Sequence, residues 1–126
     1  MTAAPRRDFP TQLLERRADA GRDIARFAVE VPSDLIFLQG HFPGFPILPG
    51  IAQIVPLALG AARRVWPDLG APRRLSRLKF RQPIYPEQIL ELHLERREEP
   101  LQVRFRVERE GRICSEGALE FPPPSA

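Results

Sequence analysis

The chain has 126 residues, of which 43% are hydrophobic and 28% charged, and its formal net charge is +3. This length suits one domain with a single modest core, so we predict one domain over residues 1–126 with flexible ends at 1–10 and 122–126. No apolar run reaches the roughly 18 residues that a membrane-spanning helix requires, and no apolar segment of a secretory signal follows the N-terminal arginines. We therefore expect a cytoplasmic protein without a membrane span.

Cysteine usage narrows the chemistry further. Cys114 is the only cysteine in the sequence, which excludes an internal disulfide and any metal site built from several cysteines. We predict a plain strand residue at this position, and neither a metal nor another cofactor.

The first clear element lies at residues 25–31, where side chains alternate between apolar and polar. Ala25, Phe27 and Val29 fall on one face and Arg26 on the other, which is the spacing of a strand. A weaker candidate for an earlier strand lies at residues 11–16.

A long apolar segment follows at residues 49–66, with the sequence PGIAQIVPLALGAARRVW. It is too long for one strand and apolar nearly all the way round, so we predict a buried helix. Pro56 lies inside it. Because proline lacks an N–H and clashes with the carbonyl group four residues back, we expect a kink or a late helix start there.

Beyond the helix the apolar period returns to two. Inward-facing sets are predicted at Leu78 and Phe80; at Leu90, Leu92 and Leu94; at Val103, Phe105 and Val107; and at Ile113, Ser115, Gly117, Leu119 and Phe121. Turn residues separate these sets, which favours an antiparallel meander. We predict an α+β fold in which a curved antiparallel sheet of five to six strands wraps around one long central helix.

The stretch HFPGFPILPG at residues 41–50 is dense in proline and glycine, which indicates a shaped loop. It places His41 beside the predicted start of the helix, where unpaired N–H groups carry partial positive charge. A histidine suits proton transfer near neutral pH, and the Gly50 N–H is a candidate donor to a carbonyl oxygen that gains negative charge. The alternative is a histidine packed in a tight turn. His93 alternates with Glu91 and Glu95, as expected for the polar face of a strand.

Residues 40–50, GHFPGFPILPG, resemble the signature loop of the beta-hydroxyacyl-acyl carrier protein dehydratases, which are hotdog-fold enzymes. Residues 79–86, KFRQPIYP, resemble the strand-and-turn element of the same family. Residues 51–54, IAQI, are similar to the dehydratase-like proteins of aryl polyene and related lipid clusters. The resemblance covers about residues 20–121.

This resemblance implies a hotdog fold and a homodimer, or a higher oligomer of dimers, with active sites at the subunit interface. It implies that a (3R)-3-hydroxyacyl thioester loses water to give the trans-2-enoyl thioester. His41 matches the base that takes the α-proton, and Gly50 matches the N–H that steadies the enolate oxygen. Substrate-binding positions would be Phe42, Gly44, Pro49, Gln53 and Val55.

One position departs from the family pattern. The acid that the family carries on the central helix corresponds here to Val55, which cannot protonate a leaving hydroxyl. The sequence offers three kinds of replacement. These are Gln53 as a hydrogen-bonding group, Glu87 or Asp34 as a carboxylate, and His41 shuttling both protons. A catalytically impaired acyl-thioester-binding protein or partner subunit, and an acyl thioesterase, therefore stay open as alternatives.

Basic residues gather after the helix. The set consists of Arg63, Arg64, Arg73, Arg74, Arg77 and Lys79, with Arg81 beyond it and only Asp68 opposing it. Such a cluster favours an acidic partner: nucleic acid, an anionic membrane surface or an acidic carrier protein. Together with the family resemblance, it predicts docking of an acyl carrier protein with a phosphopantetheine-linked acyl chain. A solvated face is the simpler alternative. Nucleic acid would explain the cluster and leave the histidine loop unexplained, and we expect none.

Overall fold

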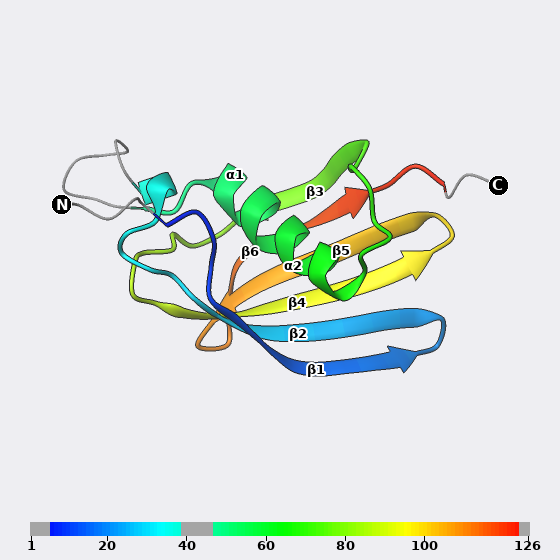
Figure 1. Cartoon of the computed structure of the whole chain (residues 1–126), viewed down its shortest axis with the longest axis horizontal. Helices are drawn as coiled ribbons and strands as arrows, with labels where there is room; N and C mark the ends of the chain where they lie inside the picture. The colour runs from blue at the N-terminus through cyan, green and yellow to red at the C-terminus, as the bar shows by residue number, and fades with distance from the viewer. Residues whose placement is uncertain (1–5, 39–46, 124–126) are drawn as a thin grey trace.

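The computed structural model describes residues 6–38 and 47–123, and its centre is one antiparallel sheet of six strands (Figure 1). The strands are β1 (Thr11–Asp19), β2 (Arg22–Glu30), β3 (Arg74–Phe80), β4 (Ile89–Glu98), β5 (Leu101–Arg109) and β6 (Arg112–Glu120). Their order in the sheet is β1-β2-β4-β5-β6-β3, so β1 and β3 are the edges. The predicted α+β architecture is confirmed, with the helix against one face of the sheet.

The helix begins at Gly50 and runs as α1 (Gly50–Ala52), a π-helical segment η2 (Gln53–Leu59) and α2 (Gly60–Val65). Pro56 lies inside η2. The wider π turn accommodates a residue without an N–H and relieves the clash that proline makes in an α turn. The prediction of a late start is wrong, because the helix continues through the proline. A short 3-10 turn, η1 (Ile36–Leu38), precedes it.

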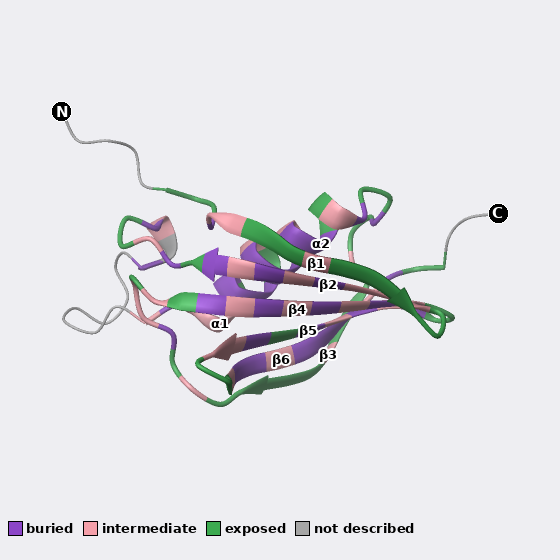
Figure 2. Cartoon of the chain, turned by 90° about the horizontal axis from the view of Figure 1, so that it is seen from below, coloured by how far each residue is buried: buried purple, intermediate pink, exposed green. Residues whose placement is uncertain are grey.

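The core lies between the helix and the inner face of the sheet. The inward sets predicted for β2, β4 and β5 are buried, and the helix contributes Ala52, Ile54, Leu57, Ala58, Ala61 and Ala62. In Figure 2 buried positions alternate with half-buried ones along the central strands, whereas the edge strands β1 and β3 are mainly exposed. The polar alternates of the central strands point away from the helix, which defines an outer face.

Strand β6 departs from strict alternation. Its pairing with β5 shifts between Val107 and Glu108, so that Ile113 lies opposite Glu108, on the outer side. Cys114 is buried instead. The prediction that Ile113 faces the core is therefore wrong by one residue, because a bulge reverses the side-chain alternation. Burial raises the pKa of the Cys114 thiol, which agrees with a plain strand residue.

The N-terminal part of the described chain is held by the fold. Phe9 is buried in the core, and the backbone of Arg6 forms an isolated parallel β-bridge with that of Leu35. Strand β1 extends to Asp19, beyond the predicted 11–16. Within the described residues, no helix has the length and apolar character needed to cross a membrane.

A polar cluster fixes the end of the helix. Arg96 donates to both carboxylate oxygens of Asp68, at 2.9 and 2.7 Å, and to Glu98 at 2.8 Å. Trp66, the residue after α2, donates its indole N–H to Asp23 at 2.9 Å. Because Arg96 is almost fully buried, these hydrogen bonds are needed to compensate its charge.

Candidate active site at the start of the helix

The segment that leads into the helix is held by hydrogen bonds to two other parts of the chain. The Leu48 N–H donates to the Ile84 carbonyl oxygen at 2.8 Å, and the Leu48 carbonyl accepts from the Gln53 Nε2 at 3.1 Å. Leu48, Ile84 and Gln53 are all buried. The residues after the histidine loop are thus anchored both to the 81–88 connection and to the helix itself.

The helix begins without a side-chain cap. Pro49 has extended backbone geometry and caps nothing with its side chain, and its carbonyl accepts from the N–H groups of Ala52 and Gln53 at 3.1 and 3.3 Å. Among the described backbone groups, none accepts from the N–H of Gly50 or Ile51. With respect to the described residues, these two donors are unpaired at the positive end of the helix.

Gly50 lies directly against an aromatic ring. A Cβ placed on Gly50 would be 2.8 Å from Cζ and 2.9 Å from Cε1 of Phe80, which is the last residue of β3. A side chain at position 50 would therefore displace the ring. The Phe80 side chain is 51% exposed and borders the helix start. Sequence reasoning placed Phe80 in the core set, although its position inside the second family motif was a signal for a role near the loop.

Val55 faces outward from the chain. It is 44% exposed, and Ile51, one turn earlier, is 62% exposed. A side chain at position 55 thus points away from this chain's own core. Gln53 differs: it is 4% exposed, and its Oε1 has no hydrogen-bond partner among the described residues. An unsatisfied buried acceptor of this kind is costly unless a ligand or another group pairs with it.

The other carboxylates proposed to replace the missing acid lie elsewhere. Asp34 is exposed, 3.5 Å from Arg6. Glu87 is exposed and lines a hollow of about 300 Å³ together with Arg6 and Val31. Residues of the helix start are absent from the described lining of that hollow. His41, Phe42 and Gly44 lie outside the described residues, so their predicted roles stay predictions.

His93 occupies the outer face, as its alternation predicts. Its Nε2 is 2.9 Å from Glu108 Oε2 and 3.6 Å from Glu91 Oε1. Burial lowers the pKa of His93, and the charge of Arg106 lowers it further. This histidine is part of a charged lattice on the sheet, away from the helix.

The six predicted docking cations are divided between two sides of the molecule. Arg63 and Arg64 lie in the last turn of α2, where they donate to the Gly70 carbonyl and the Thr11 hydroxyl. Arg73 and Arg74 lie at the start of β3, with Arg74 3.6 Å from Glu120. Arg77 and Lys79 line a hollow on the outer face of the sheet. The cations therefore do not form a single patch.

The described residues contain no group of three or more histidine, cysteine, aspartate or glutamate side chains arranged to hold a metal ion. The arrangement at the helix start offers hydrogen-bond donors for a developing negative charge, bordered by an aromatic ring and apolar side chains.

Comparison with known proteins adds independent information. Residues 16–118 match the sequence profile of the ApeI-like family, described as ApeI dehydratase. The chain is 36% identical over 104 residues to the 3-hydroxyacyl-[acyl-carrier-protein] dehydratase FabZ of Novosphingobium aromaticivorans, covering 75% of this chain and 65% of that protein. It is 33% identical over 104 residues to FabZ of Acidiphilium cryptum, covering 75% and 62%. The matched regions span a little under two thirds of the length of these two relatives.

Solved structures agree on the fold. The dehydratase heterocomplex ApeI:P from Xenorhabdus doucetiae superposes with a TM-score of 0.74 at 24% identity, covering 88% of this chain and 96% of the other. An uncharacterized protein from Erwinia carotovora subsp. atroseptica gives a TM-score of 0.71 at 23% identity, covering 93% and 96%. The predicted hotdog fold is confirmed. With a family profile matching most of its length on this fold, the chain belongs to the ApeI-like dehydratase family.

Proposed function

We propose that this protein dehydrates (3R)-3-hydroxyacyl thioesters carried on acyl carrier protein to trans-2-enoyl thioesters. The observation that carries the proposal is the pair of N–H groups at Gly50 and Ile51, which donate to no described backbone oxygen, at a helix start where a Cβ would contact the Phe80 ring. His41 removes the proton from the α-carbon, and the electron pair moves toward the thioester carbonyl. The Gly50 N–H stabilises the oxygen that gains charge. The C3–O bond then breaks as the double bond forms.

The leaving hydroxyl must gain a proton to depart as water. In this proposal His41 returns the proton that it took from the α-carbon, so the two steps balance without a second acid. Gln53 supports this route, because its Oε1, which has no partner among the described residues, can accept a hydrogen bond from the substrate hydroxyl and orient it. General acid assistance is typically worth 10²–10⁴-fold, so one group serving both steps makes a slow enzyme.

We propose that two hotdog subunits pair along β3. Among the described strands, this edge strand pairs with β6 alone, and an apolar strip accompanies it. We define the strip as the exposed residues Ile51, Leu75, Leu78 and Phe80. Exposed edge strands invite pairing with another chain. Such a dimer would bring each helix start close to the partner's strip.

We place carrier docking on the cations at the helix end and at the start of β3, namely Arg63, Arg64, Arg73 and Arg74. They are exposed and lie on the helix side or at the sheet edge. Charge attraction of this kind accelerates encounter with an acidic carrier and weakens as salt is added.

A second candidate function is that of a partner subunit. Val55 faces outward, where a carboxylate would serve a neighbouring chain, so this chain would leave the neighbour's site without an acid. One solved structure to which the chain is similar is described as a heterocomplex. In that case a carboxylate-bearing partner would complete the site of His41.

The test is to incubate the purified protein with a 3-hydroxyacyl thioester on carrier protein and to follow the products by mass. Loss of water supports the dehydratase, whereas release of free acid would identify a thioesterase. Unchanged substrate would contradict an autonomous enzyme and favour the partner subunit. His41→Ala should abolish dehydration, and His93→Ala is the matched control, which should keep it. Full activity in the His41→Ala protein would overturn the assignment.

A further inference from the structure

The outer face of the sheet, away from the helix, carries a hollow of about 750 Å³ that the proposed chemistry does not use. Side chains from all six strands line it, among them Arg77 and Lys79 of β3 and Arg104 of β5. We propose that this hollow binds a compact polyanion, that is, a small molecule bearing phosphate groups.

The strand register creates a depression between these cations. Arg104 of β5 lies opposite Ala118 of β6, and Ala118 lies opposite Ser76 of β3. The middle position of this row carries only a methyl group. Neighbouring strands are about 4.8 Å apart, so Arg104 and the Ser76–Arg77 pair stand roughly 10 Å apart across a low floor. That spacing leaves room for a phosphate group within reach of both sides.

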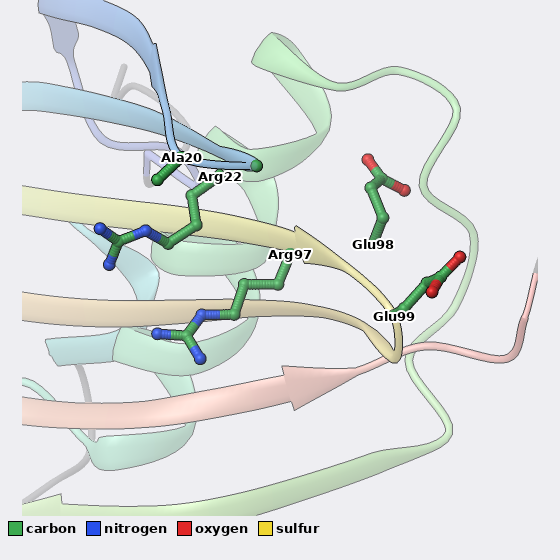
Figure 3. Close-up of a pocket in the computed structure, with 6 residues that line it drawn as sticks. Ala20, Arg22, Arg97, Glu98 and Glu99 are labelled. Atoms are coloured by element: carbon green, nitrogen blue, oxygen red, sulfur yellow. The ribbon is translucent and has the colours of Figure 1, made fainter.

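The carboxylate nearest to Arg104 is already used. Glu95 lies opposite Arg104 in the β4–β5 register, but its Oε1 accepts from Arg22 at 2.8 Å and from Arg97 at 3.4 Å. Figure 3 shows Arg22 and Arg97 side by side, directed away from Glu98 and Glu99. The Arg104 Nε is buried, with no hydrogen-bond partner among the described residues.

On the β3 side of the hollow, the nearby carboxylates are also already paired with other arginines. Glu116 lies opposite Lys79, but its carboxylate is paired with Arg81 at 3.6 Å. On β5, the Glu108 carboxylate is paired with Arg106 at 2.7 Å. Within residues 6–38 and 47–123, neither Arg77 nor Lys79 forms an ion pair of 4.0 Å or less. The hollow therefore has a neutralised half on β1, β2 and β4 and an unneutralised half on β5, β6 and β3.

Arg77 reaches the hollow through a strained backbone. The register between β3 and β6 shifts between Ser76 and Lys79, and Arg77 is the extra residue, with a φ of 55°. Non-glycine residues in this region are uncommon, and glycine or asparagine would fit with less strain. The bulge turns both Arg77 and Lys79 to the outer face. An arginine held at such a position indicates a role for its side chain.

The surroundings favour a compact ligand over an extended one. Asp19, Glu95 and Glu116 line the same hollow, so a nucleic acid strand or an anionic membrane surface would lie against carboxylates. A small phosphate-bearing molecule over Ala118 contacts the cations, and the nearby Glu116 carboxylate is already paired with Arg81. Two or three charge-assisted hydrogen bonds to Arg and Lys are the usual means of phosphate recognition.

Calorimetric titration with inorganic pyrophosphate tests the proposal on the full chain. We expect saturable binding that weakens with added salt. Lys79→Gln and Arg104→Gln should each raise Kd about tenfold, which corresponds to ~1.4 kcal/mol. Arg17→Gln, on the neutralised half, is the matched control and should leave Kd unchanged.

Arg77→Gly separates binding from folding. Because glycine adopts a positive φ without strain, this variant should raise the melting temperature while it raises Kd about tenfold, and Arg77→Lys should retain most of the affinity. Absence of saturable binding, or equal Kd in the wild type and in the Lys79 and Arg104 variants, would overturn the proposal. So would binding to phosphatidic acid vesicles without binding to pyrophosphate, which would identify a membrane surface instead.

Discussion

At the level of single residues, Val55 stands at the position where the proposed mechanism lacks a helix carboxylate. Its side chain is exposed, so Val55→Glu should change the free energy of unfolding by no more than about 0.5 kcal/mol. If a missing acid limits the reaction, this variant should raise the dehydration rate by about 10²–10⁴-fold. The measurement is single-turnover product formation, with Val65→Glu, at a half-buried position near the helix end, as control. An unchanged rate would show that His41 needs no helix carboxylate.

Gly50 allows a separate test of the helix start. Gly50→Ala should displace the exposed Phe80 ring at little cost, within about 1 kcal/mol, because the clashing atoms are the far end of a side chain. The added methyl group should nevertheless hinder approach to the N–H and lower kcat.

Gly60→Ala is the control for Gly50→Ala, since a Cβ at Gly60 meets nothing closer than 3.9 Å. It should stabilise the helix by about 0.5–1 kcal/mol, as alanine does relative to glycine, and keep full activity. Equal activity in both variants would remove the role assigned to the Gly50 N–H.

His93 gives the outer face a pH dependence. Its pKa lies below the ordinary 6.5 because of burial and Arg106, so the unfolded chain binds a proton more readily than the folded chain. The contribution of neutral His93 to the free energy of unfolding is fully present above pH 6.5. It is lost as pH falls from 6.5 toward the folded-state pKa. Denaturant unfolding of the wild type and of His93→Gln across this pH range measures the free energy of unfolding. This free energy should depend less on pH in the variant. Parallel profiles would contradict this.

At the level of elements, the stability of the connection that follows α2 depends on Asp68. Asp68→Asn removes the charge that pairs with the buried Arg96 and should destabilise the fold by about 1–3 kcal/mol. The hydrogen bonds from Arg96 hold the pKa of Asp68 below its ordinary 3.8, so this stabilisation is present above pH 3.8 and fades as pH falls through the folded-state value. Thermal unfolding of the two proteins should therefore converge in acid. A constant difference down to low pH would assign the effect to packing.

The elements were predictable to the extent that periodicity marks them. Strands β2, β4 and β5 and the helix follow from apolar spacing because each buries one continuous face. Strand β1 is mainly exposed and carries no such alternation, so its length was underestimated. The bulge at Cys114 and the π turns around Pro56 depend on tertiary packing, which short-range spacing does not encode.

The site was predictable only in part. The Pro- and Gly-rich loop located Gly50 and the helix start, because those residue types mark a shaped turn before a helix. The contact between Gly50 and Phe80 joins segments that are distant in the sequence, so local spacing carries no trace of it. The division of the cations between two sides likewise follows from the bulge at Arg77, which reverses the side-chain alternation of β3.

At the level of the whole molecule, the apolar strip predicts association. Ile51→Asp should shift the protein toward the monomer, because it places a charge in the proposed interface, while the acidic side chain suits a helix N-terminus and preserves the fold. Sedimentation velocity at several concentrations measures the change. Ile89→Asp is the matched control, since Ile89 is 69% exposed on β4 and outside the strip. Equal sedimentation of the two variants would place the interface elsewhere.

The outward orientation of Val55 also bears on how such proteins diversify. Every valine codon is one base change away from a codon for aspartate or glutamate. An exposed helix position accepts either kind of side chain without harm to the core. Mutation can therefore remove or restore the acid without crossing a folding barrier, and duplicated genes can drift into complementary pairs in which each product supplies what the other has lost.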